Sequence, residues 1–150
     1  MVKNNLSFEE LYINKTQESR KLLQIQGTEQ GRDIYGENIW INYLDAWVQI
    51  HKSRGIQVVL CGDIRFKNEF KYIKENNGIV IKVIAPKRNE QKLLLESKNN
   101  IDVLNSIKTH PSECDLDNIP NSEFDLVIHN DVNDTIDISE IELLLNKLVI

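Results

Sequence analysis

An aspartate and an arginine in the middle of the chain follow an apolar run, and their side chains could together bind phosphate. Residues 57–61 (QVVLC) have the continuous apolar character of a buried parallel strand, and Asp63 and Arg65 come just after them. Ligands of open α/β sheets bind beyond the carboxyl ends of the strands. There an aspartate can orient magnesium, and an arginine can hold a phosphate bidentately. The same spacing also fits an Asp63 that caps the next helix and pairs with Arg65 at the surface.

A glycine-rich segment over residues 27–33 (GTEQGRD) is the second candidate. Its glycines permit a close approach of the backbone to a ligand, and Arg32 adds a fixed positive charge. The alternative is a helix that ends at Gly27 and is followed by a turn, with Arg32 in solvent. Further along, Trp40 and Trp47 could stack on a substrate, although their helical spacing is more typical of core residues.

The cysteines and His110 give weaker signals. His110, Cys114 and Asp115 have a spacing like that of metal ligands, but a zinc site normally needs four ligands and no second pair is present. Cys61 lies on the predicted buried strand, where a cysteine is more often inert packing than a nucleophile. Two cysteines in a chain of 150 residues also argue against a disulfide scaffold. These residues therefore support no metal site and no thiol chemistry.

The candidate residues need an α/β framework to bring them together. The first half of the chain predicts a short helix opened by Ser7 and Glu10, a helix from Thr16 to Gly27, a helix over 37–53 and a strand over 57–61. A helix over 68–76, a strand over 79–85, a weak helix at 93–95 and a strand over 124–129 follow. The last predicted helix has its start signal at Asp137 and Glu140 and its apolar stripe from Ile141 to Leu148. Strand, helix and strand over 57–85 predict a right-handed βαβ unit. The sequence contains no repeat and no linker, so we expect a single α/β domain over residues 1–150.

The composition and net charge bear on whether the chain binds nucleic acid or membranes. Hydrophobic residues make up 41% of the chain and charged residues 27%, which is an ordinary globular balance. A net charge of −5 gives no long-range attraction for nucleic acid or anionic membranes, so any phosphate site must be built locally. The N-terminus lacks the apolar run of a signal peptide, and no stretch approaches the ~20 apolar residues of a membrane span. We expect a cytoplasmic protein without nucleic-acid or membrane partners.

Several segments, taken in order, resemble one protein family. LLQIQGTEQGRDIYGENIWI, GDIRFKNEFKYIKENNGIVIKV, THPSE and the later HND are similar to the signature segments of phage and large-DNA-virus deoxynucleoside monophosphate kinases. The match is collinear, and several motifs in the correct order are more specific than any one of them. The resemblance implies a P-loop kinase fold, with a three-layer arrangement of a parallel sheet flanked by helices. It also implies transfer of a phosphoryl group from ATP to a deoxynucleoside monophosphate, with Mg²⁺.

The resemblance assigns roles to particular residues. By position in the motifs, Asp63 would be catalytic and would organise the metal, and Arg65 would bind the transferring or acceptor phosphate. The monophosphate side would be lined by Gly27, Thr28, Glu29 and Arg32, with Trp40 supporting them. His110, Ser112 and Glu113 would lie near the lid, and Asn130 would lie in the cofactor loop on the adenine side.

The sequence also departs from the family pattern. None of its six glycines belongs to the G-x-x-x-x-G-K-[ST] loop that holds the ATP phosphates, and a site without that loop should lose several orders of magnitude in rate. The first strand of the sheet would also be missing. The strands over 57–61 and 79–85 would then either pair directly or leave an apolar gap for another chain. We therefore expect a truncated or split kinase that is inactive alone and joins a P-loop-bearing partner or a second copy. The alternative is a non-catalytic descendant that binds a nucleotide or another protein.

Overall fold

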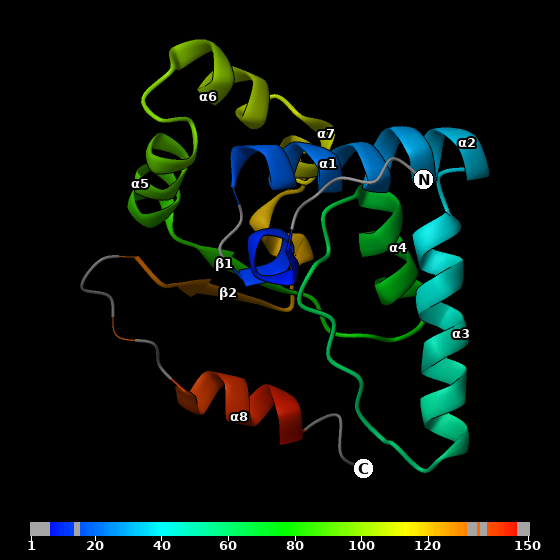
Figure 1. Cartoon of the computed structure of the whole chain (residues 1–150). Coiled ribbons are helices and arrows are strands. Elements are labelled where there is room, and N and C mark those ends of the chain that lie inside the picture. Colours follow the sequence, from blue (N-terminus) through cyan, green and yellow to red (C-terminus); the bar gives the residue numbers. More distant parts are fainter. Residues whose placement is uncertain (1–6, 14–15, 132–134, 136–137, 147–150) are drawn as a thin grey trace.

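The structure is a computed structural model that describes residues 7–13, 16–131, 135 and 138–146. Within this part, strands β1 (Ile81–Ile84) and β2 (Leu126–His129) form a two-stranded parallel sheet. Ile81 lies opposite Leu126 and Ile84 lies opposite His129. Helices surround the two strands. In the view of Figure 1, α8 (Ile138–Asn146) lies below them, and α1 (Gln17–Gly27), α5 (Pro86–Glu96) and α6 (Ile101–Lys108) lie above them. The α/β class and the parallel pairing are confirmed.

The first helices begin at the predicted caps. Ser7 and Glu10 form a reciprocal pair at the start of η1 (Glu9–Ile13). The Ser7 amide donates to Glu10 Oε2 at 2.8 Å, and the Glu10 amide donates to Ser7 Oγ at 3.2 Å. Thr16 accepts a hydrogen bond from the Ser19 amide at 3.1 Å and so caps α1 (Gln17–Gly27). These two helix starts are confirmed.

The glycine-rich segment is helical, so the predicted turn after Gly27 is wrong. Gly27 has right-handed helical angles (φ −72, ψ −39), and the chain continues through η2 (Thr28–Arg32) and α2 (Asp33–Tyr35) to Gly36, at φ 97. The wider turns of η2 depend on Gly31. A Cβ there would lie 2.8 Å from both the Gln26 carbonyl oxygen and Trp40 Cζ2. The absence of a side chain therefore lets the indole ring pack against the helix.

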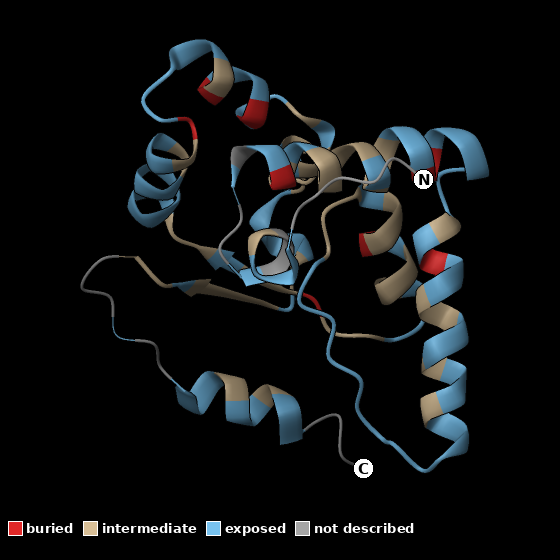
Figure 2. Cartoon of the chain, in the orientation of Figure 1, coloured by how far each residue is buried: buried red, intermediate tan, exposed pale blue. Residues whose placement is uncertain are grey.

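Helix α3 (Ile39–Ser53) matches the predicted helix, but its tryptophan face is not core. Trp40 is 42% exposed and Trp47 is 44% exposed, whereas Ile41 is buried. The neighbouring helix α4 (Lys67–Glu75) is joined to α3 by a 2.6 Å hydrogen bond from the Tyr72 hydroxyl to Asp45. Figure 2 shows exposed positions along most of α3.

Residues 57–61 do not form a strand in the structure, so this prediction is wrong. They have no regular secondary structure and run as an elongated trace between α3 and α4 (Figure 1). No strand of the described chain pairs with them, and Leu60 is 91% exposed. A continuous apolar run needs a neighbouring strand before its amides can enter a ladder, and none is provided locally. The predicted βαβ unit over 57–85 is consequently wrong as well. Of the two arrangements left open by the sequence, direct pairing of 57–61 with 79–85 does not occur.

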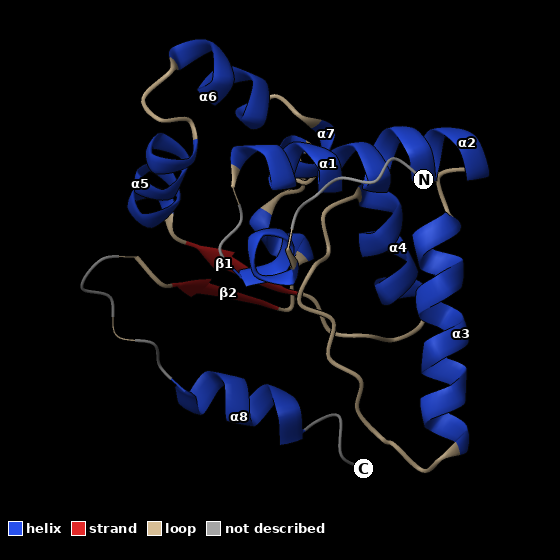
Figure 3. Ribbon diagram, in the orientation of Figure 1, coloured by secondary structure: helices blue, strands red, loops and turns tan. Residues whose placement is uncertain are grey.

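The parallel pair is closed instead by a long crossover from β1 to β2. Figure 3 shows its helices α5 (Pro86–Glu96), α6 (Ile101–Lys108) and α7 (Pro111–Cys114), which are followed by the short η3 (Asn121–Glu123). The sequence predicted only the weak helix at 93–95 in this region. Local signals for the others are nevertheless present, since Asn100 caps α6 and a proline opens α7.

The core is small and divided between two places. Among the described residues, the buried apolar side chains are Ile41, Phe70, Val80, Leu104 and Ile107. The Phe70 and Phe124 rings meet edge to face at 5.2 Å between centroids and join α4 to the start of β2. No helix of the described part is long and apolar enough to cross a membrane. Asp137 and Leu148 of the predicted last helix lie outside the described residues, and a single domain over 1–150 stays a prediction.

Candidate functional site

A cavity of about 820 Å³ lies between α1, the loop before α4, and helices α5 and α7. It is lined by Ile13, Arg20, Leu23, Gln24, Gly27, Thr28, Trp40, Asp63, Arg65, Phe66, Glu69, Lys92, Glu96, Ser112 and Glu113. This volume is in the range of small-molecule sites. The cavity brings together seven of the residues predicted from separate motifs, namely Gly27, Thr28, Trp40, Asp63, Arg65, Ser112 and Glu113.

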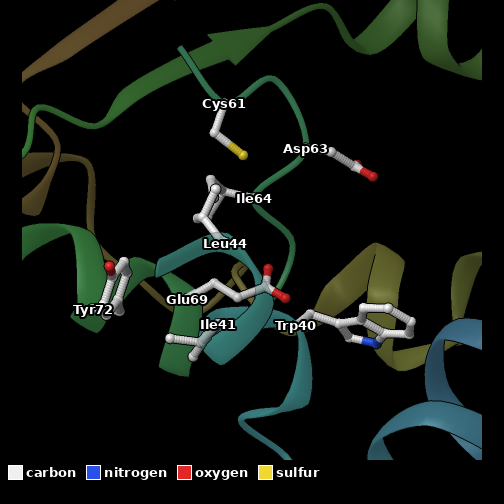
Figure 4. A pocket seen from close by; sticks show the side chains of 8 residues that line it. All are labelled: Trp40, Ile41, Leu44, Cys61, Asp63, Ile64, Glu69 and Tyr72. Atoms are coloured by element: carbon white, nitrogen blue, oxygen red, sulfur yellow. The ribbon is translucent and has the colours of Figure 1, made fainter. Parts of the chain in front are cut away.

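A smaller pocket of about 130 Å³ adjoins the same loop. Figure 4 shows its lining, in which Leu44, Cys61 and Ile64 form an apolar side. Asp63 and Trp40 line both spaces, and the Asp63 side chain points away from the apolar group in Figure 4. The loop that carries Asp63 therefore lies between an apolar pocket and the larger cavity, whose lining contains both charged and apolar side chains.

The Asp63 loop is held by the carboxylate of Glu69. The amides of Arg65 and Phe66 donate to Glu69 Oε2 at 2.8 and 3.0 Å. Glu69 thus fixes the loop and also binds the amide of Phe66, the N-cap residue of α4, so it takes the capping role that one sequence interpretation gave to Asp63. Capping by Asp63 is therefore wrong, whereas the pairing of Asp63 with Arg65 is observed.

Arg65 stands between two carboxylates at the cavity wall. Its Nε donates to Asp63 Oδ1, and its Nη1 donates to Glu113 Oε1 at 2.7 Å. Partial burial lowers the pKa of Arg65, but the hydrogen bonds and negative charges of Asp63 and Glu113 outweigh burial and raise that pKa above its usual value. The guanidinium is therefore charged at every physiological pH. The Asp63 side chain is 74% exposed, so it remains accessible to a ligand.

Arg32 lies behind this loop and not in the cavity lining. It is 8% exposed, donates to Glu69 Oε1 at 3.2 Å and to Asn68 Oδ1 at 2.7 Å, and stacks 3.8 Å from the Phe66 ring centroid. The alternative of a solvated Arg32 is wrong. The structure gives Arg32 a supporting position, because it binds the same carboxylate that holds the Asp63 loop. Direct contact of Arg32 with a substrate stays a prediction.

Two other predicted residues lie away from the cavity lining. Glu29 is exposed on η2. Asn130 follows β2, where its amide donates to the Ile84 carbonyl at 2.9 Å and its own carbonyl accepts from Arg88 Nη1 at 2.9 Å. Asn130 thus stands at the carboxyl ends of both strands, beside the start of α5. The substrate role of Glu29 and the cofactor role of Asn130 stay predictions.

His110 and Cys114 have local structural partners. His110 Nδ1 lies 2.8 Å from Ser112 Oγ and caps α7, while Cys114 Sγ lies 3.4 Å from the His110 carbonyl oxygen. Among the described residues, no group of three or more His, Cys, Asp or Glu side chains is arranged to hold a metal ion.

Sequence reasoning missed Arg20 and Gln24, which line the cavity from α1. Arg20 is 14% exposed in its side chain and donates to Glu96 Oε1 at 2.8 Å and to Glu113 Oε1 at 3.3 Å. Arg20 Nε, Gln24 Nε2 and Glu96 Oε2 are buried without a hydrogen-bond partner in the described chain. A signal was available, because residues 20, 24 and 27 follow helical spacing and share one face of α1 with the glycine of the predicted motif.

The residues that line the cavity include a carboxylate that suits magnesium. They do not include the loop that binds the phosphates of ATP. Mg²⁺ is commonly bound through one or two carboxylates together with substrate phosphates and water, and the exposed Asp63 carboxylate on the cavity wall fits that pattern. The phosphates of ATP need a cradle of backbone amides with a lysine. The 150 residues contain no G-x-x-x-x-G-K-[ST] sequence to form it, so the residues present do not fit the donor nucleotide.

Comparison with known proteins gives two relatives. The chain is 29% identical over 119 residues to a putative deoxynucleotide monophosphate kinase of Acanthamoeba polyphaga mimivirus, a match that covers 74% of this chain and 52% of that protein. It is 28% identical over 129 residues to the deoxynucleoside-5'-monophosphate kinase of Escherichia phage T5, which covers 73% of this chain and 45% of that protein.

The chain therefore spans about half the length of the curated relatives it matches. No family model matches it, and no solved structure matches it. The two relatives come from a phage and a large DNA virus, the two sources whose kinases the motifs resemble. These comparisons confirm the predicted resemblance of the chain to deoxynucleoside monophosphate kinases of phages and large viruses.

Proposed function

We propose that this chain forms the acceptor-binding part of a kinase that phosphorylates deoxynucleoside monophosphates. The observation that carries the proposal is the shared cavity. Gly27 and Thr28 come from one motif and Asp63 and Arg65 from another, and all four line the same space. Two kinases that act on deoxynucleotide monophosphates by name are similar to about three quarters of the chain, which supports the same substrate class here.

Within this proposal the cavity has a charged end and an apolar end. Arg65 supplies the guanidinium for the phosphate, since a guanidinium matches phosphate oxygens with parallel hydrogen bonds. Leu23, Phe66 and Trp40 supply apolar or aromatic surface for the base and sugar. The Trp40 ring is fixed for this role, because its Nε1 donates to the Gly27 carbonyl oxygen at 2.7 Å.

The proposal assigns the metal to Asp63. Magnesium bound there would neutralise charge on the phosphates, as it does in phosphoryl transfer generally. The chain's own contribution is to orient the Asp63 carboxylate through Arg65 and to keep both groups on the cavity wall. We derive no step through ATP, because its phosphate-binding loop is not encoded in these residues.

We propose further that a P-loop-bearing polypeptide supplies the donor half and docks on residues 56–60. This segment is extended, unpaired with any described strand, and apolar, with Ile56 47%, Val58 43%, Val59 40% and Leu60 91% exposed. A segment with unpaired backbone N–H and C=O groups and exposed apolar side chains is a template for another strand. The relatives are about twice as long as their matched regions, which supports an additional segment as the occupant.

The test is a phosphorylation assay with the purified chain, ATP, Mg²⁺ and each deoxynucleoside monophosphate. One series contains the chain alone, and a second also contains the polypeptide encoded just upstream of it. We expect diphosphate only in the second series, and Asp63→Asn should abolish it. Asp33→Asn is the matched control, because Asp33 is an exposed aspartate of α2 outside the cavity lining. Absence of diphosphate from both series would contradict the kinase proposal.

A non-catalytic role in protein interaction is the second candidate, and the exposed apolar residues 56–60 favour it. Calorimetry separates the two. Heat of binding with a deoxynucleoside monophosphate supports the kinase-related site. No heat with any nucleotide, together with complex formation or self-association in sedimentation, would leave interaction as the function.

A further inference from the structure

The Glu113 carboxylate joins two arginines that come from distant parts of the sequence. Its Oε1 accepts from Arg65 Nη1 at 2.7 Å and from Arg20 Nη1 at 3.3 Å. Arg20 belongs to α1, Arg65 to the loop before α4, and Glu113 to α7. Two guanidiniums that converge on one oxygen form the arrangement expected for an oxyanion of a phosphate group.

Arg20 also retains an unused donor at this place. Its Nη2 is bound by Glu96 and its Nη1 by Glu113, but its Nε is buried and has no partner in the described chain. A buried donor without a partner costs stability, and proteins generally satisfy such groups. An oxygen-rich ligand in the cavity that Arg20 lines would provide the missing acceptor.

The carboxylates of the cavity differ in how firmly they are held. Glu69 accepts from two backbone amides and from Arg32, so it cannot leave without opening the loop. The Glu113 carboxylate has hydrogen bonds to Arg20 and Arg65 in the described chain, and its side chain is 26% exposed. Its helix is anchored separately, through a 2.8 Å hydrogen bond from the Lys67 amide to Asp115. Glu113 can therefore turn outward by rotation of its side chain alone.

We propose that Arg20 and Arg65 together bind the phosphate of the acceptor nucleotide, and that Glu113 occupies this position in the free protein until the phosphate replaces it. The proposal rests on the proposed function for the identity of the ligand. A phosphate dianion carries more charge and more acceptor oxygens than a carboxylate, so it can displace Glu113. A nucleoside without phosphate offers no such group. The exchange therefore makes the site selective for monophosphates over nucleosides.

The test measures binding of the four deoxynucleoside 5'-monophosphates and their nucleosides by calorimetry. Glu113→Gln removes the competing charge, and we expect monophosphates to bind about fivefold more tightly, the size of a partly exposed ion pair. Arg20→Gln should weaken the same binding at least about tenfold, because it removes hydrogen bonds to a charged group. Nucleoside binding should change in neither variant.

Asp117→Asn is the matched control, since it removes one negative charge close to Glu113 in sequence from an exposed residue that does not line the cavity. It should leave binding within about twofold of the original value. Thermal unfolding of each variant verifies the fold. If Arg20→Gln does not fold, Arg20→Lys keeps the charge and should still weaken binding, since a lysine cannot reproduce the guanidinium geometry.

The outcomes separate the two proposals. Weaker or unchanged monophosphate binding in Glu113→Gln, in a chain that binds these nucleotides, would overturn the exchange and leave the proposed function intact. Binding that becomes measurable only in Glu113→Gln would support the exchange. Absence of nucleotide binding in the original chain and in Glu113→Gln would overturn both.

Discussion

The charged cavity and the apolar segment before it are built in opposite ways. Around the cavity, charged side chains from four separate segments are paired with one another, and Arg32 and Arg20 are nearly enclosed. In residues 56–60, apolar side chains lie in solvent and the backbone has no strand partner in the described chain. The difference teaches that this fold pairs most charged groups of its site with one another, although Arg20 Nε keeps no partner in the described chain, while part of its apolar surface lies exposed.

The largest expected effect is in the small core that supports both regions. Phe70 is 9% exposed and packs against Phe124, so Phe70→Ala should lower the free energy of unfolding by about 4 kcal/mol. Urea denaturation followed by circular dichroism measures this. A loss below about 1 kcal/mol would show that Phe70 is not core, and the contrast with the exposed segment would then fail.

The buried ion pair behind the Asp63 loop should have the next largest effect. Arg32→Met leaves Glu69 buried without its guanidinium and should cost about 3 kcal/mol in the same measurement. The control is Lys71→Met, which breaks the exposed pair of Lys71 with Glu75 and should cost less than about 0.5 kcal/mol. Equal effects of the two substitutions would mean that the enclosure of Arg32 contributes nothing.

A smaller, pH-dependent effect is expected at the start of the sheet. Burial raises the pKa of Asp125, but the Val80 amide at 2.7 Å and the Lys74 ammonium outweigh it, so the pKa lies below the usual 3.8. Because the folded pKa is below the unfolded one, this stabilisation is present above the unfolded pKa. It is lost as the pH falls through the folded pKa. Unfolding measured between about pH 6 and about pH 3 should therefore show a steeper loss in the original chain than in Asp125→Asn. Parallel curves would contradict this role.

The smallest effect on stability is expected in the exposed segment. Leu60 is 91% exposed, so Leu60→Ser should change the free energy of unfolding by less than about 0.5 kcal/mol. The same substitution should nevertheless weaken association with the upstream polypeptide, which sedimentation velocity can measure. Substantial destabilisation by Leu60→Ser would mean that this segment is already covered within the chain.

The sequence predicted the helices well where the signal was local. Ser7 with Glu10, and Thr16, marked helix starts that the structure contains. The prediction of a strand over residues 57–61 failed for a physical reason. An apolar run indicates burial, but it cannot specify the neighbouring strand with which a ladder must form. The turn predicted after Gly27 failed because glycine is also compatible with a helix where a ring must approach closely, as Trp40 does at Gly31.

The site was predicted in part for the same reason. Asp63 and Arg65 were found because they follow an apolar run directly. Arg20 escaped notice because its importance depends on Glu96 and Glu113, which are distant in sequence and meet it only after folding. Arg32 was recognised as a fixed positive charge. Its position behind the Asp63 loop depends on its hydrogen bond to Glu69, which lies in another segment, so the sequence around Arg32 could not predict it.

The position of Trp40 also allows ligand binding to be followed by the intrinsic fluorescence of the chain. Its indole ring lines the cavity and is fixed by the Gly27 carbonyl, whereas Trp47 stacks on His51 at 5.8 Å and lines neither pocket described above. In a Trp47→Phe chain, all indole fluorescence would come from the cavity wall. A nucleobase that enters would then be detected through the quenching of a single emitter, without any label or coupled enzyme.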